Sequence, residues 1–186
     1  PNTANIGLEN TDITTNERGA IVVNDTCESS VSGVYAVGDV NGGPQFTYIS
    51  LDDFRIVFGA LTGNSSYTLK DRKNIPYTTF LTPPLARVGL TEEDAINKGY
   101  TVKTKEMLVA TMPRAHVNDY LKGAFKIVVN AENNLILGAT LYSQGAEELI
   151  NLIKMAMDNN IPYTYFKNQI FTHPTMAENL NDLCNF

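Results

Sequence analysis

The sequence predicts an α+β fold for its larger part, in which an antiparallel sheet carries helices on one side. Two strand-like runs, 123–129 and 135–142, flank the polar turn 130–134 and predict an antiparallel hairpin. A long helix is predicted directly after this hairpin, because apolar residues recur there at helical spacing. They form one stripe that should lie on the sheet: Ala146, Leu149, Ile150, Ile153 and Met157.

The chain changes pattern near residue 70. The stretch Asn64–Asn74 is rich in Ser, Thr, Lys and Asp and has no hydrophobic periodicity, so we interpret it as a linker or a crossing loop. We therefore expect residues 1–70 to be a fragment of one domain and residues 71–186 to be a second domain. A length of 186 residues allows one domain of ordinary size or two small pieces.

The first part is predicted to contain two strands and a helix. Ala20–Val23 is a short β-branched run that predicts a strand. The run Val34–Val40 is almost continuously apolar, as is typical of a strand buried on both faces in a parallel sheet. A helix with a broad apolar face is predicted from about Ile49 to Leu61.

The second part opens with more strands. Two are predicted at 77–81 and 86–90, and Tyr100–Lys105 alternates as a half-buried strand should. Between them, Thr91–Asp94 predicts the capped start of a helix that ends at Gly99.

Asp39 would lie at the carboxyl end of the buried run, the edge at which ligands bind in open α/β sheets. A carboxylate there can accept two hydrogen bonds from a polyol, and Gly38 lets a ligand approach the backbone closely. Gly-Asp is equally common where an aspartate caps a loop, and the local pattern favours neither interpretation. The next helix would point its N-terminus at the same edge and favour an electron-rich ligand group.

The stretch Ile170–Leu180 contains the residues best suited to acid–base chemistry. His173 precedes Pro174, and Glu178 follows the histidine by five residues. Thr175 and Glu178 form a capping-box pattern, which predicts a short helix beginning there. Glu178 would then be able to fold back toward His173, and a carboxylate that fixes the tautomer of an imidazole prepares it for general acid–base catalysis. A capped helix after a surface histidine gives the same pattern.

Composition excludes several classes of function. Hydrophobic residues make up 43% and charged residues 18% of the chain, as in a globular protein. The net charge of -6 argues against a nucleic-acid or anionic-membrane partner. The sequence has no apolar run long enough to span a bilayer, and we expect no signal peptide. Because it begins with Pro1 and a polar turn, we expect it to start within a longer polypeptide.

The cysteines and histidines are few. Cys27 and Cys184 have neither CxxC nor metal spacing, so we expect ordinary buried or half-buried thiols, no structural zinc site and a reducing cytoplasm as the location. His116 is expected in a surface loop and not as a second catalytic group.

Four marks in this order resemble the C-terminal part of the class I pyridine nucleotide-disulfide oxidoreductases, such as glutathione reductase, dihydrolipoamide dehydrogenase and mercuric reductase. The resemblance covers nearly the whole chain. Its marks are Thr26 ahead of Val34–Val40, Ile75-Pro76 with Thr82-Pro83-Pro84, Val88–Glu92, and His173-Pro174-Thr175 with Glu178. The runs Asn41–Thr47 and His173–Leu183 are most similar to the bacterial flavin reductases that act on reactive chlorine species and hypothiocyanous acid.

The resemblance implies that residues 1–70 are the closing segment of an FAD-binding α/β domain. Residues 71–186 would be the interface, or dimerisation, domain. Asp39, next to Gly38, would bind the ribityl hydroxyls of FAD. The loop Gln45-Phe46-Thr47 would bring backbone donors to the pyrimidine end of the isoalloxazine ring.

The resemblance also implies a homodimer with shared active sites. His173 of one subunit would reach the redox disulfide and flavin of the other, Glu178 would orient it, and Pro174, after a cis peptide bond, would contact the cofactor. In such enzymes electrons pass from NAD(P)H to FAD and then to a cysteine pair, whose thiolate attacks a disulfide or a small oxidant substrate.

Full-length members of this family carry a GxGxxG loop, a CxxxxC redox pair and a second nucleotide-binding domain, and none of these is in the sequence. Cys27 and Cys184 are far apart and cannot replace the redox pair. We therefore expect these residues alone to be inactive. The alternative is an autonomous dimerisation module without catalytic activity. A class III flavoprotein such as an NADH oxidase is disfavoured, because those proteins lack the His-Pro-Thr ending.

Overall fold

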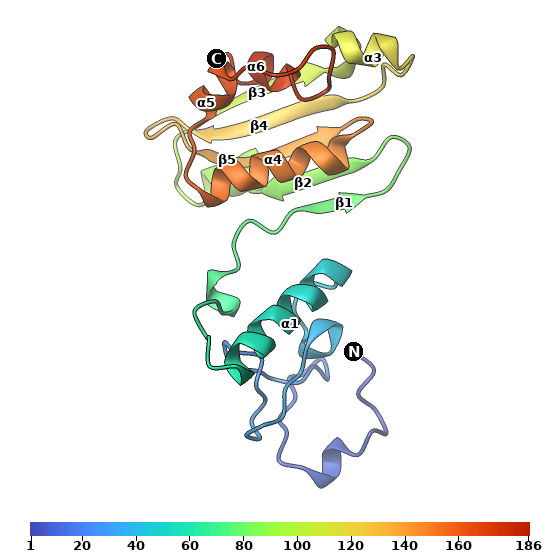
Figure 1. Ribbon diagram of the computed structural model, residues 1–186, viewed down its shortest axis with the longest axis vertical. Helices are drawn as coiled ribbons and strands as arrows, with labels where there is room; N and C mark the ends of the chain where they lie inside the picture. Colours follow the sequence, from blue (N-terminus) through green and yellow to red (C-terminus); the bar gives the residue numbers. More distant parts are fainter. The chain divides into compact units, whose positions relative to one another are not determined.

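The computed structural model describes residues 1–186, which form two compact units, Pro1–Lys73 and Asn74–Phe186. The first unit contains little regular structure (Figure 1). Its elements are the 3-10 turn η1 (Leu8–Asn10), the 3-10 turn η2 (Gly38–Asn41), the helix α1 (Thr47–Leu61) and the 3-10 turn η3 (Leu69–Asp71).

The two strands predicted in the first unit are not formed. The run 20–23 makes only isolated β-bridges, and the run 34–40 makes a single bridge before its end becomes η2. A parallel strand satisfies its backbone only through neighbouring strands, and this chain supplies none beside it. Val34 and Val37 consequently stay 39% and 41% exposed, and the predicted burial on both faces is wrong for this chain.

Helix α1 is where the sequence predicts a helix, but Ile56 is the only residue of the predicted apolar face that is buried. Its buried residues are Ile49, Asp53 and Ile56, which share one side of the helix at spacings of four and three. The larger apolar residues of the predicted face remain exposed: Leu51, Phe54, Phe58 and Leu61. A charged residue thus occupies the centre of the buried stripe.

The second unit is a five-stranded antiparallel sheet with the strand order β1-β2-β5-β4-β3. Its strands are β1 (Tyr77–Thr79), β2 (Leu85–Gly89), β3 (Val102–Leu108), β4 (Ala124–Asn130) and β5 (Ile136–Tyr142). The predicted hairpin is confirmed, since β4 and β5 pair antiparallel with Phe125 opposite Leu141 and Ile127 opposite Ala139.

Helices cover one face of this sheet, where α4, α5 and α6 lie together (Figure 1). The helices of the unit are α2 (Glu92–Asn97), α3 (Pro113–Val117), α4 (Ala146–Asp158), α5 (Tyr163–Asn168) and α6 (Asn179–Leu183), with the 3-10 turn η4 (Val109–Thr111). Helix α2 begins at the predicted cap, where the Asp94 N–H donates to Thr91 Oγ1 at 3.0 Å. None of the helices has the length and apolarity that crossing a bilayer requires.

The core of the second unit lies between α4 and the sheet. Phe125, Ile127 and Val129 alternate along β4 and are all fully buried. Ile150 and Ile153 of α4 are 2% and 0% exposed and belong to the same cluster. Burial of each such side chain contributes about 1.5–3 kcal/mol. The α+β fold is therefore confirmed for this part of the chain.

Candidate functional site

His173 and Glu178 form a hydrogen-bonded pair. Nδ1 of His173 lies 2.8 Å from Oε2 of Glu178. An ionised carboxylate only accepts hydrogen bonds, so Nδ1 carries the hydrogen and Nε2 keeps its lone pair in the neutral ring. The imidazole is 68% exposed while the carboxylate is 18% exposed, and Nε2 has no hydrogen-bond partner within the chain. The pair therefore presents a basic nitrogen outward.

A backbone turn holds Glu178 in place. Thr175 N–H donates to Glu178 Oε1 at 3.2 Å, and Glu178 N–H donates to Thr175 Oγ1 at 3.2 Å, which are the two bonds of a capping box. Each carboxylate oxygen thus has its own partner, one on the backbone and one on the imidazole.

Helix α6 nevertheless begins at Asn179, with Glu178 and not Thr175 in the N-cap position, so the predicted cap is wrong by three residues. The backbone forms three-residue turns at this point, with Asn179 N–H bonded to Met176 O and Leu180 N–H bonded to Ala177 O. The Asn179 side chain also donates to the carbonyl oxygens of Thr175 and Met176. These bonds use the carbonyls that an α-helix would need in its first turn.

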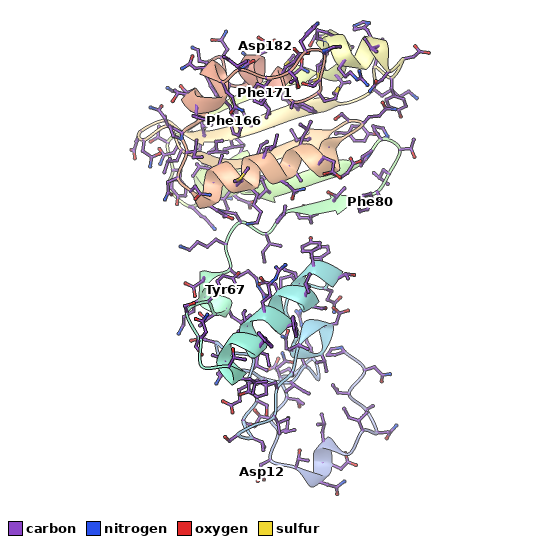
Figure 2. The ribbon with its side chains drawn as sticks, in the orientation of Figure 1. Asp12, Tyr67, Phe80, Phe166, Phe171 and Asp182 are labelled. Atoms are coloured by element: carbon purple, nitrogen blue, oxygen red, sulfur yellow. The ribbon has the colours of Figure 1, made fainter.

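The loop before His173 is fastened to the rest of the unit. Asn181 Nδ2 donates to the carbonyls of Phe166 and Gln169, at 2.6 and 2.9 Å. The side chains of Phe166 and Phe171, labelled in Figure 2, pack into or against the core. The His173–Pro174 bond is cis, as expected. The imidazole is thus presented from a fixed loop.

The predicted flavin-side residues lie in the first unit. Asp39 occupies the 3-10 turn η2 and not a strand end, and it is exposed. Gly38 has φ +71, and a Cβ there would come within 2.6 Å of Ser50 Oγ, so the turn requires glycine. Gln45-Phe46-Thr47 lies at the start of α1, as predicted. The helix has no side-chain cap and no acidic residue in its first turn, so its dipole favours an electron-rich group there.

The two cysteines and His116 are separate from the His173–Glu178 pair and from the predicted flavin-side residues. Burial raises the pKa of the Cys27 thiol to about 11 and that of the Cys184 thiol to about 12, which keeps both protonated and non-nucleophilic at neutral pH. His116 lies in helix α3 and not in the expected loop. Its side chain is exposed, with Nε2 2.8 Å from the carbonyl oxygen of Ala110.

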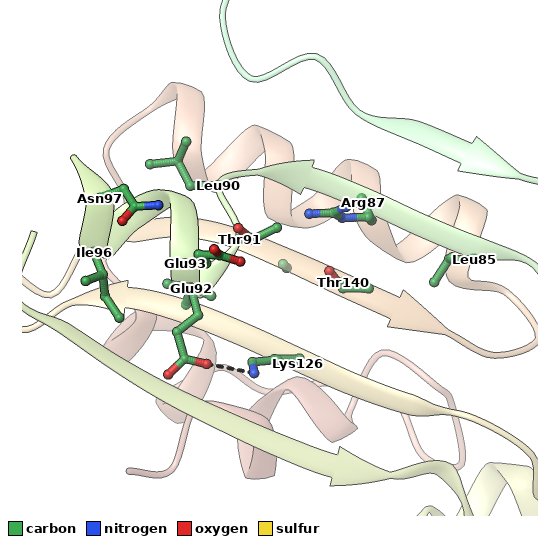
Figure 3. Close-up of a pocket in the computed structure, with 12 residues that line it drawn as sticks. Leu85, Arg87, Leu90, Thr91, Glu92, Glu93, Ile96, Asn97, Lys126 and Thr140 are labelled. Carbon is green, nitrogen blue, oxygen red and sulfur yellow. Dashed lines mark ion pairs between the residues drawn. The ribbon is translucent and has the colours of Figure 1, made fainter.

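A hollow of about 640 Å³ lies on the face of the sheet opposite α4 (Figure 3). Lys126 and Glu92 form an ion pair of 2.8 Å in it. None of the predicted site residues lines this hollow. The alternation in β4 could have indicated this hollow from the sequence. Lys126 stands between the buried Phe125 and Ile127, so its side chain must lie on the opposite face of the sheet.

Comparison with known proteins identifies both units. Residues 75–184 match the pyridine nucleotide-disulphide oxidoreductase dimerisation domain, and residues 1–53 match the pyridine nucleotide-disulphide oxidoreductase family. The probable pyridine nucleotide-disulfide oxidoreductase RclA of Escherichia coli is 48% identical over 183 residues, which cover 98% of this chain and 42% of RclA. The mercuric reductase of Staphylococcus aureus is 34% identical, with 97% and 33% covered.

A solved structure agrees with these matches. The HOCl-induced flavoprotein disulfide reductase RclA from Escherichia coli superimposes with a TM-score of 0.96 at 47% identity, covering 99% of this chain and 42% of that one. The chain spans less than half the length of these relatives. Because the dimerisation-domain match covers more than half of the chain and coincides with the sheet unit, this chain belongs to the pyridine nucleotide-disulphide oxidoreductase family.

Proposed function

We propose that the chain is the C-terminal part of an FAD-dependent NAD(P)H:disulfide oxidoreductase, or of one that reduces a related thiol-reactive oxidant. The family membership and the 48% identity to RclA support this proposal. NAD(P)H would bind to a part of the longer protein outside these residues. Activity belongs to that longer protein, and the 186 residues alone are inactive.

Residues 74–186 join two such subunits into a homodimer. The support is the match to a dimerisation domain. Ile170 is 94% exposed and precedes His173 by three residues. A large apolar side chain so exposed gains free energy when a second subunit covers it.

The His173–Glu178 bond of 2.8 Å, with Nε2 exposed, carries the catalytic proposal. Nε2 accepts the proton of an attacking thiol in the partner subunit's site, and the resulting thiolate attacks the substrate. When the S–S bond breaks, the same nitrogen returns a proton to the departing sulfur. Glu178 holds the ring in the required tautomer and stabilises the imidazolium between the two steps.

The first unit contains hydrogen-bonding groups that fit FAD. The exposed Asp39 carboxylate accepts hydrogen bonds, as the hydroxyls of a ribityl chain require, and Gly38 allows the η2 turn to pack against Ser50. The uncapped start of α1, at Gln45-Phe46-Thr47, suits an electron-rich ring edge. Bound FAD supplies two-electron transfer between the nicotinamide and the disulfide.

The test is steady-state turnover of the full-length holoprotein with His173→Ala. Loss of an acid–base residue should slow turnover roughly 100- to 10,000-fold, while the visible flavin spectrum stays that of bound FAD. His116→Ala is the matched control, since that imidazole is also exposed and hydrogen-bonded, and it should leave turnover unchanged. Normal turnover in His173→Ala would remove this residue from the reaction.

A further inference from the structure

The first unit contains a buried charge that the proposed chemistry does not use. Asp53 is 0% exposed, in the middle of α1. Removing a carboxylate from water costs several kcal/mol unless hydrogen bonds and an opposite charge replace the lost hydration. The groups that bond to Asp53 therefore indicate its structural role.

Both oxygens of Asp53 have partners. Oδ2 accepts from the backbone N–H of Gly38 at 2.7 Å and from Asn41 Nδ2 at 2.9 Å. Oδ1 accepts from Arg72 Nη2, which supplies the opposite charge. Burial lowers the pKa of Arg72, but its hydrogen bonds to Asp53 and Asp52 more than offset this and hold it above the ordinary value.

The first two partners are the first and last residues of η2. One carboxylate thus ties both ends of this turn to helix α1. Asp39, which lies between them, has its backbone position fixed relative to the helix whose N-terminus begins eight residues further on. Asn41 also donates to Ala36 O and accepts from Gly43 N–H, so that the flanking chain is held as well.

Asp52, the preceding residue on the same helix, makes none of these contacts with the turn. Its Oδ2 accepts from Arg72 Nε at 2.7 Å and from the hydroxyl of Tyr67 at 3.2 Å, the tyrosine labelled in Figure 2. The two neighbouring carboxylates therefore share the guanidinium of Arg72, and only Asp53 contacts the turn.

We infer that Asp53 is a positioning residue for the cofactor site, which holds the Asp39 turn at a fixed place relative to the start of α1. The inference rests on the proposed function, in which Asp39 and the start of α1 contact FAD. Asp53 does not touch the cofactor. It acts through Gly38 and Asn41, while Arg72 keeps its charge balanced.

The test measures FAD affinity in the full-length protein. FAD is removed, and its dissociation constant is measured at 25 °C from the change in flavin fluorescence on rebinding. Asp53→Asn removes the charge and leaves a single acceptor oxygen, so either the two turn donors or the guanidinium of Arg72 must lose their partner and face the amide NH₂ instead. Because a hydrogen bond to a charged group is being lost, we expect FAD to bind roughly 10-fold more weakly, with a changed fine structure in the visible flavin spectrum.

Asp52→Asn is the matched control. It removes a carboxylate from the same helix and from the same guanidinium, yet leaves the turn bonded to Asp53. Its FAD dissociation constant should stay within about 2-fold of the starting protein. An equal loss of affinity in Asp52→Asn and Asp53→Asn would show that only the Arg72 charge balance matters, and would overturn the positioning role.

Two further variants separate the possible failures. Asn41→Ala removes one turn-side hydrogen bond to Asp53 but leaves the charges of Asp53 and Arg72 in place, and it should weaken FAD binding by roughly 3- to 10-fold. It decides the question if Asp53→Asn does not fold. Asp39→Ala tests the cofactor contact itself. If Asp39→Ala weakens FAD binding while folded Asp53→Asn and Asn41→Ala do not, the positioning role of Asp53 is wrong and the FAD contact of Asp39 stands. Unchanged FAD affinity in Asp39→Ala overturns both the cofactor contact and the positioning role.

Discussion

Replacing Glu178 with glutamine tests the acid–base pair most directly, because the side chain keeps its size while the charge is removed and one acceptor oxygen becomes an NH₂ donor. In the structure one oxygen accepts from Thr175 N–H and the other from His173 Nδ1. Glutamine has a single oxygen. If that oxygen stays on Thr175, the amide NH₂ faces Nδ1, and the imidazole must adopt the other tautomer, with the hydrogen on Nε2.

The expected size of the effect follows from the exposure of the pair. A hydrogen bond to a charged group contributes about 1.5–3 kcal/mol. His173 is 68% exposed within one chain, which places the isolated pair at the lower end. At 1.4 kcal/mol for each factor of ten, full-length Glu178→Gln should turn over about 10-fold more slowly, and up to about 100-fold if the partner subunit excludes water.

The assay has two parts. Turnover is measured on the full-length protein, and the tautomer is read from imidazole ¹⁵N shifts of the 186-residue chain at a pH where the ring is neutral. The chain has two histidines, so His116→Ala assigns the remaining signal to His173. An unchanged tautomer together with unchanged turnover in Glu178→Gln would refute the role of the carboxylate.

Three further predictions concern stability, measured by denaturant unfolding of the 186-residue chain. Ile153→Ala should cost about 2–5 kcal/mol because the side chain is fully buried, whereas Ile96→Ala, at a 54% exposed residue, should change stability by less than about 1 kcal/mol. Gly123→Ala should cost at least about 3 kcal/mol, since its φ is +123 and a Cβ would lie 1.8 Å from a carbonyl oxygen, while Gly99→Ala, with φ +84 and open space, should cost about 1 kcal/mol. Folding raises the pKa of the Cys184 thiol to about 12. The protonated thiol therefore contributes fully to stability below about pH 9, and this contribution is lost as the pH rises. Between pH 7 and pH 11, Cys184→Ala should lose about 2–3 kcal/mol less stability than the parent chain. Equal effects in either matched pair, or equal alkaline losses with and without the thiol, would contradict the corresponding argument.

Local patterns predicted the second unit well. The alternation in β4, the apolar stripe of α4 and the Thr91 capping box each specify structure through neighbours close in sequence, and each appears as predicted. The His173–Glu178 bond was likewise foreseeable, because five residues and a proline-bounded turn bring the two side chains together.

The first unit shows where such reasoning stops. The run 34–40 has the composition of a buried parallel strand, but a strand exists only where other strands accept its hydrogen bonds. Most of the predicted apolar face of α1 is exposed for a related reason. Amphipathic spacing shows that a face prefers burial, and only the surrounding structure determines which face is covered.

The sequence by itself thus determined the α+β unit, its hairpin and the pairing of His173 with Glu178, since those depend on short-range spacing. Tertiary structure alone decided that Asp53 lies at 0% exposure between Gly38, Asn41 and Arg72. Those groups are distant along the chain, with partners up to nineteen positions apart. No local pattern encodes such a contact, because the free energy that makes burial of a carboxylate tolerable comes only from partners that folding brings to it.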